Sequence, residues 1–91
     1  MKYIICYDIK ENKIRSRLVK YLEGQAFRIQ YSVFSCDCSS EKITDIRNQL
    51  LDITKSAKRP LLLIVPVCHT CAKSMWMYGT PLEEDKPFFL V

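Results

Sequence analysis

The 91-residue sequence predicts a single α+β domain in which two helices cover one face of an antiparallel sheet. Apolar residues recur at helical spacing in two segments, 11–23 and 39–56. Strand patterns occupy three others, 2–9, 26–36 and 61–67, and the two types alternate along the chain. A chain of this length buries only about two thirds of its unfolded surface, so a partner subunit would add stability.

The first strand and the first helix are regular in pattern. Segment 2–9 is apolar at nearly every position, which predicts a strand covered on both faces. In segment 11–23, Ile14 and Leu22 belong to one apolar side, and basic residues occupy the other. Gly24 follows as the left-handed residue that commonly ends a helix.

The middle of the chain changes to a period of two. Phe27 and Ile29 belong to one alternating face, with Arg28 on the other, as expected for a strand with one core face. The fold class requires one further strand, and the stretch 26–38 is long enough to bend or to form a hairpin around Ser35.

The second helix and the last core strand have clear boundaries. The pair Ser39-Ser40 provides an N-cap, and Glu41 in the first turn complements the helix dipole. Segment 61–67 predicts a strand buried on both sides, with Pro66 at an edge or bend. The resulting order is β-α-β-(β)-α-β, which is the ferredoxin-like sandwich.

The end of the chain is less regular. Residues 69–81 show no periodicity, and residues 87–91 form a short apolar terminus with strand character. We therefore divide the chain into a domain at 1–78 and a tail at 79–91. The last strand is expected to pair with the sheet edge of a second copy, because apolar strands need cover, and a homodimer is the default assembly.

The net charge of +4 lies entirely in residues 1–36, which hold seven basic and three acidic side chains. This placement indicates an anionic partner, and nucleic acid before a membrane surface. Two separate glycines cannot build a Gly-rich phosphate loop, so ATP- or NAD-dependent chemistry is not expected. No apolar run is long enough to span a bilayer or form a signal peptide, which predicts a cytoplasmic protein.

Asp8 is the first candidate for chemistry, because a carboxylate at the end of an apolar strand is costly to keep charged without a cation. It could pair with Arg15 or Arg17, or cap the following turn. It could also bind a metal. One carboxylate is a poor site for a hard cation, but two copies of Asp8 across a dimer axis could share one Mg²⁺.

A basic set concentrated on the first helix is the second candidate. These side chains form either an ordinary solvated face or a phosphate-binding surface, and their coincidence with the whole net charge favours phosphate contact. Nearby aromatic residues could stack on bases or belong to the core. The basic residues are Lys13, Arg15, Arg17, Lys20 and Arg28, and the aromatic ones are Tyr7, Tyr31 and Phe34.

Four of the five cysteines form two close pairs after strands, and four thiolates would suffice for a tetrahedral zinc. The pair Cys68 and Cys71 has suitable spacing, but the pair Cys36 and Cys38 is too tight for an ordinary zinc knuckle, which argues against a zinc site. A redox dithiol is disfavoured because the helix that usually follows one is only weakly indicated. Cys6 is expected to be a small core residue.

Four segments together resemble the second CRISPR-associated protein family, the small nuclease-like subunit of the spacer-acquisition module. They are YIICYDI, NKIRSRLVKYLEG, FRIQYSVFSC and LLLIVPVCHTC, and they span about residues 2–71. The resemblance implies a ferredoxin-fold homodimer whose C-terminal strand crosses onto the partner. A Cys-x-x-Cys after the last core strand also recurs in the family. The resemblance therefore implies a structural role for Cys68 and Cys71 and argues further against zinc.

The resemblance also implies an activity and its residues. Asp8 would bind Mg²⁺ together with its mate across the dimer, and Arg15 or Arg17 would offset charge on the reacting phosphate. The resemblance also places four further positions around the site at Tyr7, Arg28, Ser32 and Phe34. The basic helix contributes two more candidate nucleic-acid contacts, Lys13 and Lys20. The implied function is metal-dependent endonuclease activity on single-stranded RNA or double-stranded DNA, or scaffolding of an integrase subunit on duplex DNA.

Two other classes fit the same pattern. A ribonuclease toxin of the virulence-associated type would share the fold and would cleave RNA without an integrase partner. A purely structural DNA-binding subunit would bind duplex DNA without Asp8.

Overall fold

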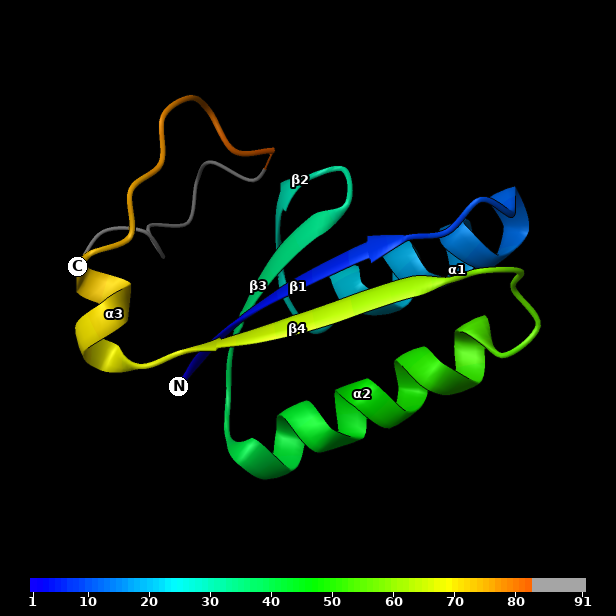
Figure 1. The fold of residues 1–91 in the computed structure, drawn as a ribbon, viewed down its shortest axis with the longest axis horizontal. Coiled ribbons are helices and arrows are strands. Elements are labelled where there is room, and N and C mark those ends of the chain that lie inside the picture. Colours follow the sequence, from blue (N-terminus) through cyan, green and yellow to red (C-terminus); the bar gives the residue numbers. More distant parts are fainter. Residues whose placement is uncertain (83–91) are drawn as a thin grey trace.

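The computed structural model describes residues 1–82, and within them it confirms the ferredoxin-like β-α-β-β-α-β order (Figure 1). The expected terminal strand at 87–91 lies outside the described residues. A short third helix, which the sequence indicated only weakly, follows the last strand. The elements are β1 (Lys2–Asp8), α1 (Asn12–Glu23), β2 (Phe27–Gln30), β3 (Val33–Asp37), α2 (Ser40–Thr54), β4 (Leu61–Val67) and α3 (His69–Lys73).

The four strands form one antiparallel sheet in the order β2-β3-β1-β4. β1 is therefore central, and β2 and β4 are the two edges. Lys2 pairs with Val67 and Asp8 pairs with Leu61, so β1 and β4 are in register over their whole length. This pairing places the end of β1 beside the start of β4 (Figure 1).

The core lies between the sheet and the two longer helices, which cover one face of the sheet (Figure 1). Alternate residues of β1 point into it, because successive strand side chains point to opposite faces. The largest side chains that are wholly buried come from both layers, and they are Ile5, Leu18, Leu22, Phe34, Ile46 and Leu50. None of the described helices is long and apolar enough to cross a membrane.

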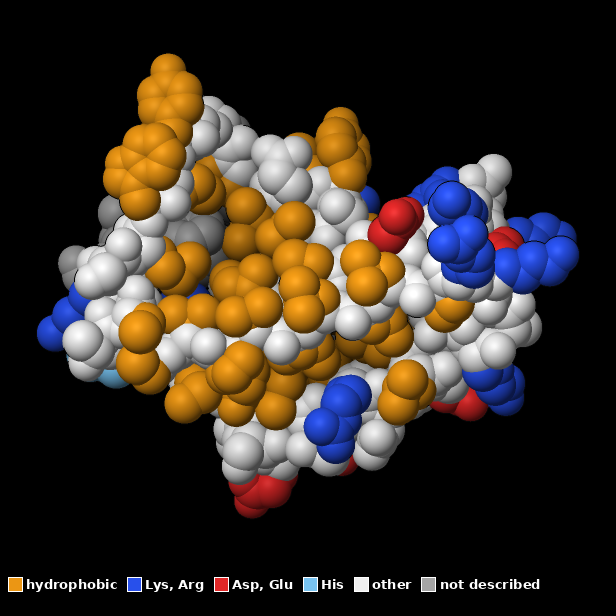
Figure 2. Space-filling model, viewed as in Figure 1, with side chains coloured by type: hydrophobic (Ala, Val, Ile, Leu, Met, Phe, Trp, Pro, Cys, Tyr) orange, Lys and Arg blue, Asp and Glu red, His pale blue; other side chains and the backbone are white. Residues whose placement is uncertain are grey.

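The second face of the sheet, which we call the open face, has no helix over it among residues 1–82. Register places Ile4, Cys6 and Asp8 on the same face as their partners Val65, Leu63 and Leu61. The three β4 side chains are 40%, 49% and 56% exposed. The expectation that β4 is buried on both sides is therefore wrong for the described residues, and hydrophobic side chains gather at the surface on this face (Figure 2).

The missing strand comes from a hairpin whose turn is at Tyr31 and Ser32, instead of near Ser35. Ser35 is buried within β3, where it pairs with Phe27. The β2–β3 register shifts after Arg28, and this irregularity interrupted the alternation expected from the sequence. Tyr31 consequently leaves the predicted core face and is 71% exposed.

The helix ends differ in how well they were predicted. Ser39 caps α2 as expected, since its hydroxyl accepts a hydrogen bond from the Lys42 backbone N–H at 3.1 Å. Gly24 is not left-handed, because its φ is −83°. Instead, the carbonyls of Tyr21 and Leu22 accept hydrogen bonds from the backbone N–H groups of residues 24–26, and these bonds hold the turn after α1.

Candidate nucleic-acid interface

Asp8 ends β1 with its side chain exposed on the open face. Its carboxylate forms no ion pair with any described residue, so the pairings considered with Arg15 and Arg17 are absent. Nowhere in residues 1–82 do three His, Cys, Asp or Glu side chains cluster to hold a metal ion. A hard cation at Asp8 would need ligands from a second copy, water or substrate.

Arg15 braces the loop between β1 and α1 and does not reach Asp8. Its guanidinium donates to the backbone carbonyl of Ile9 at 2.8 Å, to that of Lys10 at 3.3 Å, and to Oδ1 of Asn12. These three acceptors lie in the residues directly after Asp8. Arg15 therefore positions the chain that follows the candidate metal ligand, a role that sequence spacing did not predict.

Arg28 connects the β2–β3 hairpin to the end of α1. Its guanidinium forms an ion pair with Glu23 at 3.6 Å and donates to the Tyr31 carbonyl at 2.9 Å. It also lies 5.6 Å from the ring centroids of both Tyr31 and Phe34. The same Tyr31 carbonyl accepts a 2.5 Å hydrogen bond from the Tyr7 hydroxyl. The hairpin turn is thus fastened to β1 and α1.

An open cleft of about 600 Å³ lies between α1 and this hairpin turn. Three cationic side chains and one carboxylate line it, so the cleft carries an excess of positive charge. Burial raises the pKa of Tyr7, which therefore keeps its phenolic proton as a donor at neutral pH. The lining residues are Tyr7, Arg15, Ser16, Val19, Lys20, Glu23, Arg28, Tyr31 and Ser32.

The basic stripe on α1 extends this cleft toward solvent. Lys13, Arg17 and Lys20 are exposed, and none of them forms an ion pair within residues 1–82. Ser32 is exposed in the hairpin turn, where a ligand could reach it. Phe34 is completely buried, so it supports Arg28 and offers no ring face to a nucleic-acid base.

The two cysteine pairs have different surroundings. Cys36 is buried and donates to the Gln25 carbonyl, and burial raises the pKa of its thiol to about 12. Cys68 and Cys71 are exposed. Cys68 caps α3, and hydrogen bonding from Cys71, first from its backbone N–H at 3.4 Å, lowers the pKa of Cys68. The helix that the sequence indicated only weakly is present, but it begins directly after Cys68 and includes Cys71.

We expect these surroundings to set the order of thiol reactivity. In the folded protein at pH 7.5, iodoacetamide should modify Cys68 at least about tenfold faster than Cys36, because the thiolate is the nucleophile and Cys36 is both buried and protonated. Peptide mass spectrometry over a time course measures both rates. In urea the two rates should converge, and equal rates in the folded protein would contradict the assignment.

One long-range contact at the site carries no signal in the sequence. Oε2 of Glu11 accepts a 2.8 Å hydrogen bond from the backbone N–H of Lys58, which lies 47 residues later. This contact fastens the turn before β4 to the start of α1. From the sequence alone, Glu11 is an ordinary charged residue in the first turn of a helix.

The geometry defines a class: a small ferredoxin-like protein with a basic cleft and an exposed aspartate at the end of its central strand. Comparison with known proteins agrees with it. The family model described as CRISPR associated protein Cas2 matches residues 1–75. A Synechocystis sp. protein named CRISPR-associated endoribonuclease Cas2 3 is 37% identical over 85 residues, which cover 93% of this chain and 91% of that protein. The chain belongs to the Cas2 family.

Other relatives support the same assignment. A Rhodospirillum rubrum protein named CRISPR-associated endoribonuclease Cas2 4 is 32% identical over 92 residues, which cover 99% of this chain and 73% of that protein. Streptococcus pyogenes Cas2 matches in fold with a TM-score of 0.71, covering 87% of this chain and all of that chain, at 19% sequence identity. At that identity the structural likeness establishes the fold alone.

Proposed function

We propose that this chain is the homodimeric endonuclease subunit of a CRISPR spacer-acquisition system and hydrolyses phosphodiesters with Mg²⁺. The observation that carries the proposal is the exposed and unpaired Asp8 at one end of β1, next to the basic cleft and the basic stripe of α1. The names of the relatives, which describe them as endoribonucleases, support the same activity.

The residues present fit a shared divalent cation. Asp8 is exposed, forms no ion pair with a described residue, and lies on the face that a second copy would cover. A bound Mg²⁺ would supply polarisation of the phosphodiester and a lower pKa for an attacking water. Asp8 would hold that ion, Arg17 would attract the phosphate, and Arg15 would keep the loop after Asp8 in place.

The open face supplies the reason for a homodimer. Hydrophobic side chains gather over β1 and β4 (Figure 2), and an exposed aromatic pair follows α3 in the chain. In that pair, Trp76 and Tyr78 are 85% and 89% exposed, and their rings stack at 6.4 Å. An apolar surface of this kind favours association with a second copy, which would also bring the two Asp8 carboxylates together.

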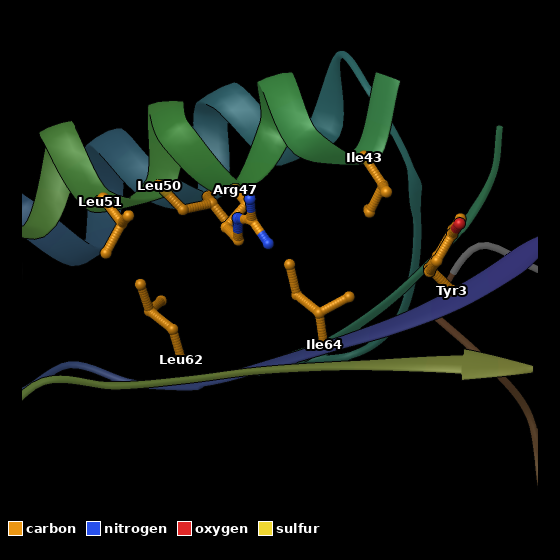
Figure 3. A pocket seen from close by; sticks show the side chains of 7 residues that line it. All are labelled: Tyr3, Ile43, Arg47, Leu50, Leu51, Leu62 and Ile64. Carbon is orange, nitrogen blue, oxygen red and sulfur yellow. The ribbon is translucent and has the colours of Figure 1, made fainter. Parts of the chain in front are cut away.

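The free edge of β4 could receive the terminal strand of that second copy. A groove of about 430 Å³ lies along this edge, between α2 and β4. Its side chains from the helix and the strand face one another across the groove (Figure 3). An apolar strand added to β4 would pair its backbone and fill the groove. The lining residues are Tyr3, Ile43, Arg47, Leu50, Leu51, Leu62 and Ile64.

A second candidate function is a non-catalytic scaffold that binds duplex DNA together with an integrase subunit. One observation favours it: within residues 1–82 no three His, Cys, Asp or Glu side chains cluster, so the described part of one copy offers no complete set of metal ligands around Asp8. The basic surface would then bind phosphates, and Asp8 would contribute nothing to affinity. The ribonuclease toxin of the same fold has no observation that favours it over these two.

A matched cleavage and binding assay tests the proposal. The wild-type chain should cut single-stranded RNA or double-stranded DNA in Mg²⁺ and lose that cleavage in EDTA, while retaining salt-sensitive binding in both. End-labelled substrates on denaturing gels report cleavage, and fluorescence anisotropy reports binding. Cleavage that is equal in Mg²⁺ and EDTA would exclude the metal mechanism. Binding without cleavage of either substrate would favour the scaffold.

A further inference from the structure

The turn between α2 and β4 lies at the same end of the molecule as Asp8. β4 begins at Leu61, which pairs directly with Asp8, so the turn residues 55–60 immediately precede the strand beside the candidate metal ligand. α1 also begins at this end (Figure 1). In the space-filling view, several Lys and Arg side chains gather here (Figure 2).

Glu11 holds this turn in position. The 2.8 Å hydrogen bond from the Lys58 backbone N–H to Oε2 of Glu11 joins the turn to the residue just before α1. That hydrogen bond is the main cause of a lowered pKa at Glu11, so the carboxylate is ionised at neutral pH. The contact leaves the Lys58 side chain unconstrained, because only its backbone is used.

Two of the three basic side chains in the turn are available to a ligand. Lys55 forms an ion pair with Asp52 at 3.3 Å within the same helical turn. Lys58 and Arg59 are exposed, and neither forms an ion pair with a described residue. An exposed lysine and arginine could be an ordinary solvated turn, so charge alone does not decide the role.

The backbone of Arg59 is the independent observation. Its φ is +52°, in the left-handed region that glycine adopts without strain and that other residues enter at a cost. It is the single non-glycine residue with a positive φ among residues 1–82. A strained position that carries a cationic side chain, beside a candidate phosphate site, points to a use for that side chain.

We propose that the α2–β4 turn is a second phosphate-binding element, in which Lys58 and Arg59 contact the nucleic-acid backbone and Glu11 is the positioning residue. The inference rests on the proposed function and adds a second contact to it. The cations of α1 and those of the turn then lie on two elements that flank the end of β1. A nucleic-acid backbone held by both would pass the Asp8 carboxylate.

Arg59→Gly separates this role from folding, because glycine relieves the backbone strain while the charge is lost. Binding of a fluorescent 30-base-pair duplex should weaken about three- to tenfold at ~0.1 M salt, and the slope of log K against log salt should fall by about one for each lost phosphate contact. Lys58→Ala should reduce duplex affinity and the salt slope by similar amounts. The control Lys55→Ala should bind as tightly as wild type, since the Lys55 ammonium is already paired with Asp52.

Glu11 gives a test whose sign distinguishes positioning from simple electrostatics. Removing a negative charge should strengthen binding to phosphates if charge alone matters. We expect Glu11→Ala to weaken duplex binding about threefold, because the turn loses its hydrogen bond, and Glu11→Gln to bind at least as well as wild type, because the amide oxygen still accepts it. All binding is measured well below the melting temperature of each variant, which circular dichroism determines.

Arg17→Ala separates this inference from the proposed function. If Arg17→Ala weakens binding while Arg59→Gly and Lys58→Ala match wild type, the second phosphate element is wrong and the proposed basic surface stands. If the turn variants weaken binding and Arg17→Ala does not, the element stands and the α1 surface is wrong. Stronger binding by Glu11→Ala than by wild type would overturn the positioning role.

Discussion

Asp8→Asn is expected to reduce Mg²⁺-dependent cleavage by at least about a hundredfold while changing nucleic-acid affinity less than about twofold. The amide keeps the size and shape of the side chain but removes the charge that holds the cation. Asp8 is exposed and forms no ion pair with a described residue, so its replacement should leave the melting temperature unchanged. Initial cleavage rates at saturating substrate measure the loss.

Asp45→Asn is the matched control, because Asp45 is also exposed but lies on α2, away from the end of β1. It should cleave at the wild-type rate. If Asp8→Asn retains more than half of the wild-type activity, the Asp8 metal site is wrong. If Asp8→Asn loses nucleic-acid binding as well as cleavage, Asp8 acts in binding and the separation proposed between the two roles fails.

Leu63→Glu is expected to convert a dimer to a monomer and to abolish cleavage although Asp8 is intact. Leu63 is 49% exposed at the centre of β4 on the open face, opposite Cys6. Burying an unpaired carboxylate at an interface costs several kcal/mol, so the dimer dissociation constant should rise at least about a hundredfold. Sedimentation velocity gives the oligomeric state, and the cleavage assay gives the activity of the same sample.

Asn48→Glu provides the comparison, since Asn48 is also exposed but belongs to α2 and does not line the groove beside β4. We expect this variant to remain dimeric, because it lies on the helical layer, away from both the open face and the groove. A Leu63→Glu protein that sediments as the wild type does would show that the open face is not the interface. A monomeric Leu63→Glu protein with full cleavage would show that one copy of Asp8 suffices.

The order of elements could be read from the sequence because it depends on local periodicity. Apolar spacing identified both long helices and three of the strands, and the N-cap predicted at Ser39-Ser40 is Ser39. The hairpin turn was misplaced because the irregular pairing after Arg28 breaks the period of two. β4 appeared doubly buried because its side chains are apolar on both faces, although the described helices cover only one of them.

The residues of the candidate site also differ in how far the sequence predicted their roles. Asp8 and the α1 cations stood out from the sequence because a charge at a strand end and a basic helical stripe are local patterns. The actual partners of Arg15 are backbone carbonyls, which carry no sequence signal. Phe34 could have been a base-stacking residue by type, and only its complete burial removes it from contact with a ligand.

The sequence by itself therefore determined the fold class, the basic character of the first 36 residues and the prominence of Asp8. The tertiary structure decided which side chains are free to act: it left Asp8 and Lys58 without ion pairs among the described residues and used Arg15 as a brace. It also joined Glu11 to a turn 47 residues away. Local periodicity encodes elements, whereas the pairing of polar groups depends on how distant segments meet in space.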